Sequence, residues 1–212
     1  SYGFSNVVLP MVLHGVPVRL APVPFPRVIE EIFSHHESLA VPAVPSIWRA
    51  WHRAGILKDL PVSLAVSAGA PLALALETEV FNASGLKIHN FYGASECGGI
   101  SYDATDTPRA HADIVGTLLP GVNVGVGEQG RLLVGSDAVA LGYDESRHDD
   151  LLADNRYLTR DIGFLDPSGA LHLSGNTGGA INVSGRKLRP PNVDSVLMAT
   201  GLFHRVRLFG IP

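Results

Sequence analysis

Cysteine is almost missing from this chain: Cys97 is the single cysteine among 212 residues. No disulfide can therefore form within the chain, which is typical of a reducing compartment, and we expect a cytoplasmic location. Basic residues are also scarce. Lys and Arg number 16 against 20 Asp and Glu, so the net charge is −4. Because a dedicated nucleic-acid binder carries a basic surplus, the composition disfavours that class of protein.

Long apolar runs are absent as well. None approaches the roughly 18 residues of a membrane span. The opening stretch SYGFSNVVLPMVLHG lacks the basic start and the cleavage site of a signal peptide. It begins abruptly in apolar sequence, so we expect the chain to be part of something longer. What is abundant is apolar composition, at 46%, which favours a globular fold.

The region before residue 108 alternates short apolar runs with helical patterns. Such alternation predicts a mostly parallel sheet layered with helices, an α/β subdomain over residues 1–108. Ser46 is expected to cap a helix that Gly55 ends. The expected strands cover 16–23, 39–44, 64–69 and 87–93, and the expected helices cover 26–36, 47–54 and 71–82.

After residue 108 the helical pattern fades, and short apolar runs are joined by glycine-rich turns. In DPSG (166–169), proline presets one turn dihedral and glycine supplies the positive one, which predicts a hairpin. We therefore expect a small antiparallel β-barrel over residues 109–176. A hinge and the opening segment of an α+β C-terminal domain are expected over residues 177–212.

The stretch FYGASECGG, residues 91–99, combines three glycines with one carboxylate. It follows an expected strand, at the edge where open parallel sheets bind ligands. Neither the dinucleotide fingerprint nor the nucleoside-triphosphate loop fits its spacing. One interpretation is a plain glycine turn between a strand and a helix. The other is a site in which the Ser95 hydroxyl contacts phosphate and the Glu96 carboxylate holds Mg²⁺.

Five motifs stand in an order that resembles the AMP-forming ligases, which include acyl- and aryl-CoA synthetases, luciferases and peptide-synthetase adenylation domains. The resemblance extends over essentially the whole chain. The opening SYGFSNVVLPMVLHG looks most like the acyl-pocket region of aryl-CoA synthetases. The motifs are SAGAPL (67–72), FYGASE (91–96), GRLLVGSDAVALGY (130–143), YLTRDIG (157–163) and INVSGRKLRP (181–190).

The resemblance implies a role for each matching residue. Tyr92 would stack on adenine, and Gly93 would let substrate approach the backbone closely. Ser95 would contact phosphate and Glu96 would hold Mg²⁺, which makes these two residues the catalytic candidates. Asp161 would accept hydrogen bonds from both ribose hydroxyls.

Further residues are implied by position in the family pattern. Gly69 and Ala70 would border the adenine and acyl pockets, and Tyr2 would lie near the acyl group. Asn176 would contact the nucleotide where the family usually has an arginine. Arg160 replaces the family's glycine, where its side chain would either crowd the backbone or help to bind a phosphate.

The reaction implied by the resemblance has two steps. A small-molecule carboxylic acid attacks ATP in the presence of Mg²⁺ and gives acyl-AMP; a thiol of CoA, or of a carrier protein's phosphopantetheine, then displaces AMP. The family's phosphate loop and catalytic lysine would lie outside residues 1–212, so we expect this chain by itself to be inactive. Two alternatives stay open, a degenerate nucleotide- or acyl-binding module and an assembly domain of a larger complex. A homodimer is a further candidate assembly.

Three other residues invite functional interpretations. Trp48 and Trp51 lie three positions apart on an expected helix, where packing in the core is a simpler explanation than stacking on a ligand. Cys97 would be a poor nucleophile, because the adjacent carboxylate raises the pKa of a thiol and no histidine is placed for it by the sequence. We expect Cys97 to be a small buried residue.

Overall fold

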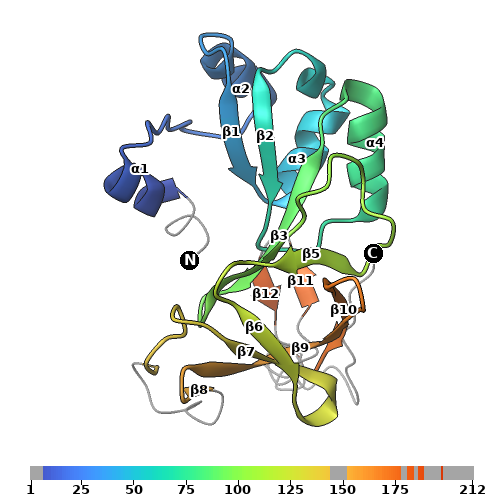
Figure 1. The fold of residues 1–212 in the computed structure, drawn as a ribbon. Coiled ribbons are helices and arrows are strands. Elements are labelled where there is room, and N and C mark those ends of the chain that lie inside the picture. The colour runs from blue at the N-terminus through green and yellow to red at the C-terminus, as the bar shows by residue number, and fades with distance from the viewer. Residues whose placement is uncertain (1–6, 144–151, 178–180, 184–185, 189–196, 198–212) are drawn as a thin grey trace.

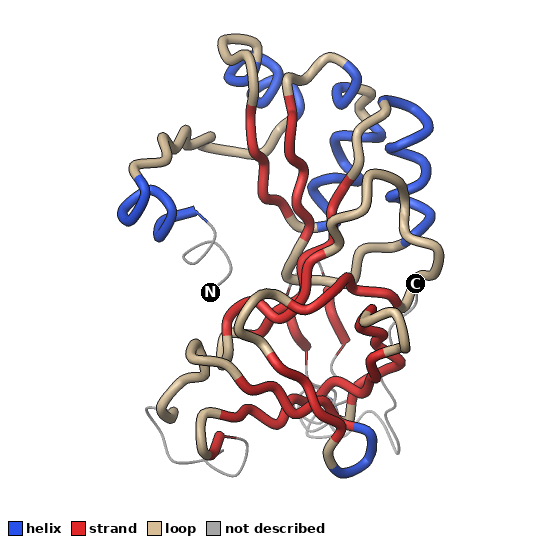
Figure 2. Tube along the Cα trace, viewed as in Figure 1, coloured by secondary structure: helices blue, strands red, loops and turns tan. Residues whose placement is uncertain are grey.

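The computed structural model describes residues 7–143, 152–177, 181–183, 186–188 and 197. The four α-helices for which bounds are given lie in the first half of the chain, and a short 3₁₀ turn lies in the second half (Figures 1 and 2). They are α1 (Leu9–His14), α2 (Pro26–Phe33), α3 (Pro45–Arg53) and α4 (Leu74–Ser84), with short 3₁₀ turns η2 (Ile56–Lys58) and η3 (Glu128–Gly130).

Strands occupy most of the remainder. They are β1 (Leu39–Ala43), β2 (Val62–Ser67), β3 (Ile88–Ala94), β4 (Gly98–Tyr102), β5 (Ile114–Leu118), β6 (Asn123–Val126), β7 (Arg131–Gly135), β8 (Leu152–Ala153), β9 (Arg156–Leu165), β10 (Ala170–Asn176), β11 (Ile181–Val183) and β12 (Arg186–Leu188). Ten of them form one sheet in the order β1-β2-β3-β4-β5-β10-β9-β7-β6, with β8 beside β9, and β11 pairs with β12.

The first part of the sheet is parallel, as the sequence predicts: β2 pairs in parallel with both β1 and β3. Side chains from α2, α3 and α4 pack with those of these strands in one apolar core. Trp48 and Trp51 lie in this core, 0% and 3% exposed, with their rings edge to face at 5.2 Å. Their interpretation as packing residues is therefore confirmed.

The expected strand over residues 16–23 is wrong. These residues are mostly exposed and make no strand. Pro17 and Pro22 explain the error, because proline cannot donate the hydrogen bonds of a strand ladder. The segment is instead fixed at its end, where Trp51 Nε1 donates a hydrogen bond to the Pro24 carbonyl at 2.8 Å.

The expected cap at Ser46 is also wrong. Helix α3 begins at Pro45, and the residue in the N-cap position is Val44, which is extended and makes no side-chain cap bond. Proline at the first helical position has a suitable φ and lacks only an N–H that would be unpaired there. Gly55, at φ 76°, follows the helix as predicted.

Strand β3 changes partner along its length. Its first residues, Ile88 to Asn90, pair in parallel with β2, whereas Phe91 to Ala94 pair antiparallel with β4. FYGASECGG therefore forms a hairpin between two strands, and the expected turn from a strand into a helix is wrong. A pair of glycines opens β4, and glycine weakens the strand signal of a sequence.

After residue 108 every described strand pair is antiparallel, in agreement with the sequence. Strand β4, which the sequence does not predict, lies before this point and already pairs antiparallel with β3 and β5. A second apolar core fills this region. The DPSG turn joins β9 to β10, with Gly169 at φ 86° and its N–H bonded to the Asp166 carbonyl at 3.0 Å. Two expectations stay predictions. These are the closure of these strands into a barrel and the subdomain boundaries at residues 108 and 176.

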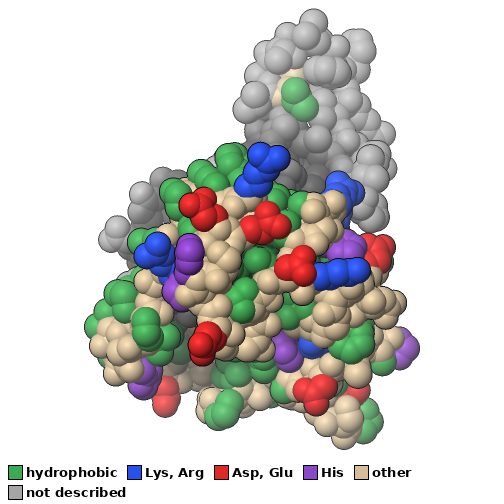
Figure 3. Space-filling model, turned by 90° about the horizontal axis from the view of Figure 1, so that it is seen from above, with side chains coloured by type: hydrophobic (Ala, Val, Ile, Leu, Met, Phe, Trp, Pro, Cys, Tyr) green, Lys and Arg blue, Asp and Glu red, His purple; other side chains and the backbone are tan. Residues whose placement is uncertain are grey.

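On the face shown in Figure 3, the described residues form no patch of a single charge sign. Acidic and basic side chains are interspersed among apolar ones. This matches the nearly balanced composition. Among the described helices, none has the length and apolar character needed to cross a membrane.

Candidate functional site

The β3–β4 hairpin carries four of the predicted site residues. Tyr92 and Gly93 lie on β3, while Ser95 and Glu96 lie in the turn. A Cβ at Gly93 would stand 2.5 Å from the carbonyl oxygen of Gly98. The hairpin itself therefore requires glycine at this position, whatever approaches it from outside.

Tyr92 and Asp161 lie side by side although 69 positions separate them. The Tyr92 hydroxyl donates to Asp161 Oδ2 at 2.7 Å. Burial, and then the Asp161 carboxylate, raise the pKa of the Tyr92 phenol. The phenol therefore stays protonated as a donor, and its half-buried ring stands beside a carboxylate acceptor.

Asp161 is held by its own strand. The Thr159 hydroxyl accepts a hydrogen bond from the Asp161 N–H and donates one to the Asp161 carbonyl, both at 3.1 Å. Thr159 is 1% exposed, so this brace is protected from water. The sequence shows Thr159 only as part of the YLTRDIG motif and gives no sign of this role.

Asn176 stands opposite Asp161 in the β9–β10 ladder. The pairing of the two strands shifts between Leu173 and Gly175, one step away, and such bulges commonly redirect side chains beside functional sites. The Arg160 carbonyl accepts the Thr177 N–H at 2.7 Å. Tyr92, Asp161 and Asn176, taken from three strands, thus form the part of the predicted site that the fold assembles.

Glu96 belongs to a second group of polar side chains. Its Oε1 lies 3.4 Å from the donating Tyr143 hydroxyl, and its carbonyl accepts the Ala140 N–H at 2.7 Å. Burial and the Glu96 carboxylate raise the pKa of both Tyr143 and Tyr157. The residues 140–143 therefore support the turn, a contact that the sequence motif does not reveal.

The turn offers one carboxylate and one hydroxyl to a ligand. Ser95 is exposed and Glu96 is half-buried. Among the described residues, no group of three His, Cys, Asp or Glu side chains is arranged to hold a metal ion.

Cys97 is buried, as expected. It is 0% exposed, and burial raises the pKa of its thiol to about 12, with Glu96 adding to the rise. A thiol that is neither accessible nor ionised is unsuited to nucleophilic chemistry.

Gly69 and Ala70 follow β2 at the carboxyl edge of the parallel strands. Ser67 is the ladder partner of Asn90, so this loop and Tyr92 leave neighbouring strands at the same edge. Gly69 has φ +80°, and the nearest atom to an added Cβ lies 3.6 Å away. Backbone conformation, more than crowding, requires this glycine. Tyr2 lies outside the described residues.

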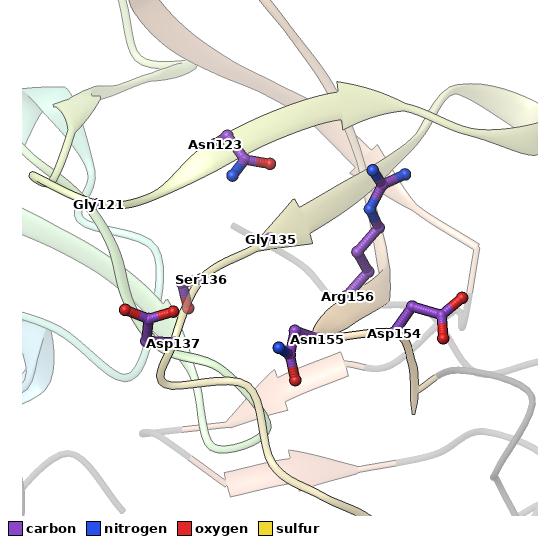
Figure 4. Close-up of a pocket in the computed structure, with 8 residues that line it drawn as sticks. All are labelled: Gly121, Asn123, Gly135, Ser136, Asp137, Asp154, Asn155 and Arg156. Atoms are coloured by element: carbon purple, nitrogen blue, oxygen red, sulfur yellow. The ribbon is translucent and has the colours of Figure 1, made fainter.

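A separate cavity of about 220 Å³ includes none of the predicted site residues. Figure 4 shows it between the ends of β6 and β7 and the turn from β8 to β9. Asp154 and Asn155 both have positive φ and make the two-residue turn of a tight hairpin. The cavity is lined by Gly121, Asn123, Gly135, Ser136, Asp137, Asp154, Asn155 and Arg156.

Solved structures resemble this fold. The amide bond synthetase McbA from Marinactinospora thermotolerans superposes with a TM-score of 0.76 at 22% identity, over 88% of this chain and 41% of that protein. A malonyl-CoA ligase in a ternary product complex with methylmalonyl-CoA and AMP has a TM-score of 0.69 at 18% identity, over 88% and 44%. At such identities the likeness shows the fold alone.

Curated relatives are similar in sequence. A 3-[(3aS,4S,7aS)-7a-methyl-1,5-dioxo-octahydro-1H-inden-4-yl]propanoyl:CoA ligase from Rhodococcus jostii (strain RHA1) is 26% identical over 226 residues, covering 100% of this chain and 43% of the relative. The uncharacterized acyl–CoA ligase YhfT from Bacillus subtilis (strain 168) is 26% identical over 180 residues, covering 80% and 36%. The chain thus spans less than half the length of these relatives. The family described as AMP-binding enzyme matches residues 1–144, and the chain belongs to it.

Proposed function

We propose that this chain supplies the nucleotide and acyl subsites of an ATP-dependent, carboxylate-adenylating ligase of the acyl- or aryl-CoA synthetase kind. The observation that carries the proposal is the 2.7 Å hydrogen bond from Tyr92 to Asp161. It joins two residues of separate family motifs in one place. Relatives named as CoA ligases support the same activity.

The pair suits the two parts of adenosine. The Tyr92 ring offers a π-face for adenine at the edge of the sheet. An ionised carboxylate has about four acceptor positions, so Asp161 can accept ribose hydroxyls while Tyr92 bonds its Oδ2. Asn176, opposite Asp161 in the ladder, would add an amide for the ribose or a phosphate.

The turn fits a magnesium ion that is bound mainly by phosphates. Mg²⁺ commonly takes one or two carboxylates from a protein and completes its shell with substrate phosphates and water. Glu96 and Ser95 provide that donor set, a half-buried carboxylate beside an exposed hydroxyl. When bound, the cation would neutralise phosphate charge; Glu96 would hold it, and Ser95 would donate to a phosphate oxygen.

The reaction would proceed in two substitutions. A carboxylate oxygen attacks the α-phosphorus of ATP, forming acyl-AMP and releasing pyrophosphate. The thiol of CoA then attacks the acyl carbon, forming the thioester and releasing AMP and a proton. A carrier-protein phosphopantetheine as the acceptor, a homodimeric assembly and a cytoplasmic location stay predictions.

The acyl subsite would prefer an aryl or medium-sized apolar acid. The opening segment resembles that of aryl-CoA synthetases, and the small residues Gly69 and Ala70 leave room beside the parallel strands. A panel of carboxylic acids in thermal-shift assays with AMP tests this preference. A clear preference for acetate or for amino acids would contradict it.

Arg160 and Asn176 favour a second candidate, a module that binds nucleotide or acyl groups without turnover, because both depart from the family pattern. Calorimetry with ATP, AMP and an acyl-AMP mimic separates the candidates. Binding together with acid-dependent pyrophosphate release by the complete gene product supports the ligase. Binding without turnover supports the module, and no binding of any of the three supports an assembly role.

A further inference from the structure

Four charged side chains are buried together outside the candidate site. Glu77 comes from α4, Lys87 precedes β3, Asp103 follows β4, and Arg109 lies in the loop before β5. None is more than 7% exposed. We call them the ionic quartet. Two acids and two bases make the quartet neutral, and nothing in their spacing along the sequence predicts that they meet.

Every charge in the quartet is paired. The Lys87 ammonium contacts the Glu77 carboxylate and lies 2.5 Å from Asp103 Oδ2. Arg109 Nε donates to Glu77 Oε2 at 2.7 Å, and the Arg109 backbone N–H donates to Oε1 at 3.0 Å. Burial raises the pKa of Asp103, but the hydrogen bonds from Lys87 and Thr105 outweigh burial and leave the pKa below its ordinary value.

Arg109 also binds the backbone of two other segments. Its guanidinium donates to the Leu72 carbonyl at 2.7 Å and to the Ile114 carbonyl at 2.6 Å. Leu72 ends the SAGAPL loop that contains Gly69 and Ala70, and Ile114 begins β5. One rigid fork therefore fixes the loop after β2 against the start of β5, the strand that pairs with β4 of the hairpin.

Asp103 fixes the hairpin that carries Tyr92 and Glu96. Its N–H donates to the Asn90 carbonyl of β3 at 2.9 Å. Next to it, a Cβ at Gly116 would stand 2.2 Å from the Tyr102 carbonyl carbon, so β5 packs directly on the backbone at the end of β4. The quartet thus reaches both segments that frame the candidate nucleotide site.

Stability alone is a weak reason for such a cluster, since apolar replacements of buried ion pairs are often as stable. What apolar residues cannot do is donate hydrogen bonds to the Leu72 and Ile114 carbonyls. We propose that Arg109, oriented by Glu77, is a positioning residue: without touching the ligand, it sets the 67–72 loop against the β3–β4 hairpin for nucleotide binding. The inference rests on the proposed function of that site.

The test compares the wild-type 212-residue chain with Arg109→Lys. Lysine keeps the charge beside Glu77 but cannot donate to both carbonyls with a fixed fork. We expect faster amide hydrogen exchange at residues 68–73 and AMP affinity about five- to tenfold weaker, in line with the loss of one or two hydrogen bonds.

Val80→Ala is the matched control. Val80 is 0% exposed on the same helix as Glu77 and packs in the apolar core. It should lower the melting temperature and leave AMP affinity unchanged, because a purely structural loss does not move the loop. A second variant, Lys87→Met with Asp103→Asn, removes both ion pairs of Lys87 and leaves the pair between Arg109 and Glu77. It should speed amide exchange at residues 98–103 and leave exchange at residues 68–73 as in wild type.

Two results would overturn the inference: unchanged exchange at residues 68–73 in Arg109→Lys, or an affinity loss no larger than that of Val80→Ala at an equal fall in melting temperature. Failure of the proposed function looks different. A wild-type chain that binds no AMP would contradict both the site and the nucleotide part of this inference, whereas a chain that binds AMP equally well after Arg109→Lys would contradict the inference alone.

Discussion

The two ends of β3 lie in different environments. Ile88, at the first end, pairs in parallel with β2 and packs among helices in the first core. Tyr92, near the second end, pairs antiparallel with β4 and contacts the second core. The parallel region supplies the loop with Gly69, and the antiparallel region supplies Asp161. The candidate site is therefore built where the two kinds of sheet meet, and its geometry depends on how firmly they are joined.

A substitution in the antiparallel core shows whether the two regions unfold together. Leu132 on β7 is 0% exposed, so Leu132→Ala should cost about 2–5 kcal/mol of unfolding free energy. Both tryptophans, Trp48 and Trp51, lie in the parallel region and report on it by fluorescence. Because β3 and the ionic quartet join the regions, the fluorescence and circular-dichroism midpoints should fall by the same amount.

The contrary outcome for Leu132→Ala is a fall in the circular-dichroism midpoint with an unchanged fluorescence midpoint. It would show that the parallel region unfolds independently and that the junction is weak. Val80→Ala, which makes the corresponding cavity on the parallel side, serves as the reciprocal variant.

A methyl group added to the β3–β4 hairpin tests the junction between the two regions with a smaller expected loss of stability. In Gly93→Ala the new Cβ would meet the Gly98 carbonyl at 2.5 Å, so the strands must separate, which should cost about 1–3 kcal/mol of stability. AMP affinity should fall as well, because Tyr92 is adjacent. Gly125→Ala on β6 is the control, since an added Cβ there meets nothing within 4 Å. Equal denaturation midpoints for the two variants would refute the packing explanation.

The smallest effect that we expect is a pH dependence of stability that arises from side chains of the antiparallel region. His172 lies between Asp113 Oδ2 at 2.9 Å and Asp166 Oδ2 at 3.2 Å, and its ring stacks on Phe164. The hydrogen bond to Asp113 chiefly raises the pKa of His172. The Ser168 hydroxyl and then His172 lower the pKa of Asp166 to about 2.

The direction of that pH effect follows from the shifts. A raised histidine pKa gives stability that is present in full below the ordinary value of about 6.5 and is lost as pH rises through the folded-state value. The lowered carboxylate pKa values give stability that is present above about pH 4 and is lost in stronger acid. The denaturation midpoint of wild type should therefore exceed that of His172→Asn most between about pH 4 and 6.5. If the difference between the two midpoints stayed constant up to about pH 9, the ion pairs of His172 could not be the cause of the difference.

Local patterns explain which parts of the fold are predictable. Alternating apolar runs and helical spacing predict β1 to β3 with α2 to α4, and the turn chemistry of DPSG predicts the β9–β10 hairpin, because each of these features depends on neighbours in sequence. The strand expected at 16–23 fails because Pro17 and Pro22 break the ladder despite apolar neighbours.

The site is predictable only in part, for a similar reason. Motif order identifies Tyr92 and Asp161 singly, but their hydrogen bond depends on the register of β3, β9 and β10. The contact between Tyr143 and Glu96, 47 positions apart, likewise depends on packing, whereas the Thr159 brace joins residues two positions apart on β9. The ionic quartet joins residues 10 to 32 positions apart, and no sequence period marks such pairs.

The central claim is that Tyr92 and Asp161 together bind a nucleoside. The most direct measurement is calorimetric titration of AMP and of 2′-deoxy-AMP into wild type and Asp161→Ala, with Asp59→Ala, an exposed aspartate in the parallel region, as control. Wild type and the control should prefer AMP, whereas Asp161→Ala should bind AMP at least about tenfold more weakly and lose the preference, since charge-assisted hydrogen bonds contribute about 1.5–3 kcal/mol each. Unchanged AMP affinity in folded Asp161→Ala would contradict the account.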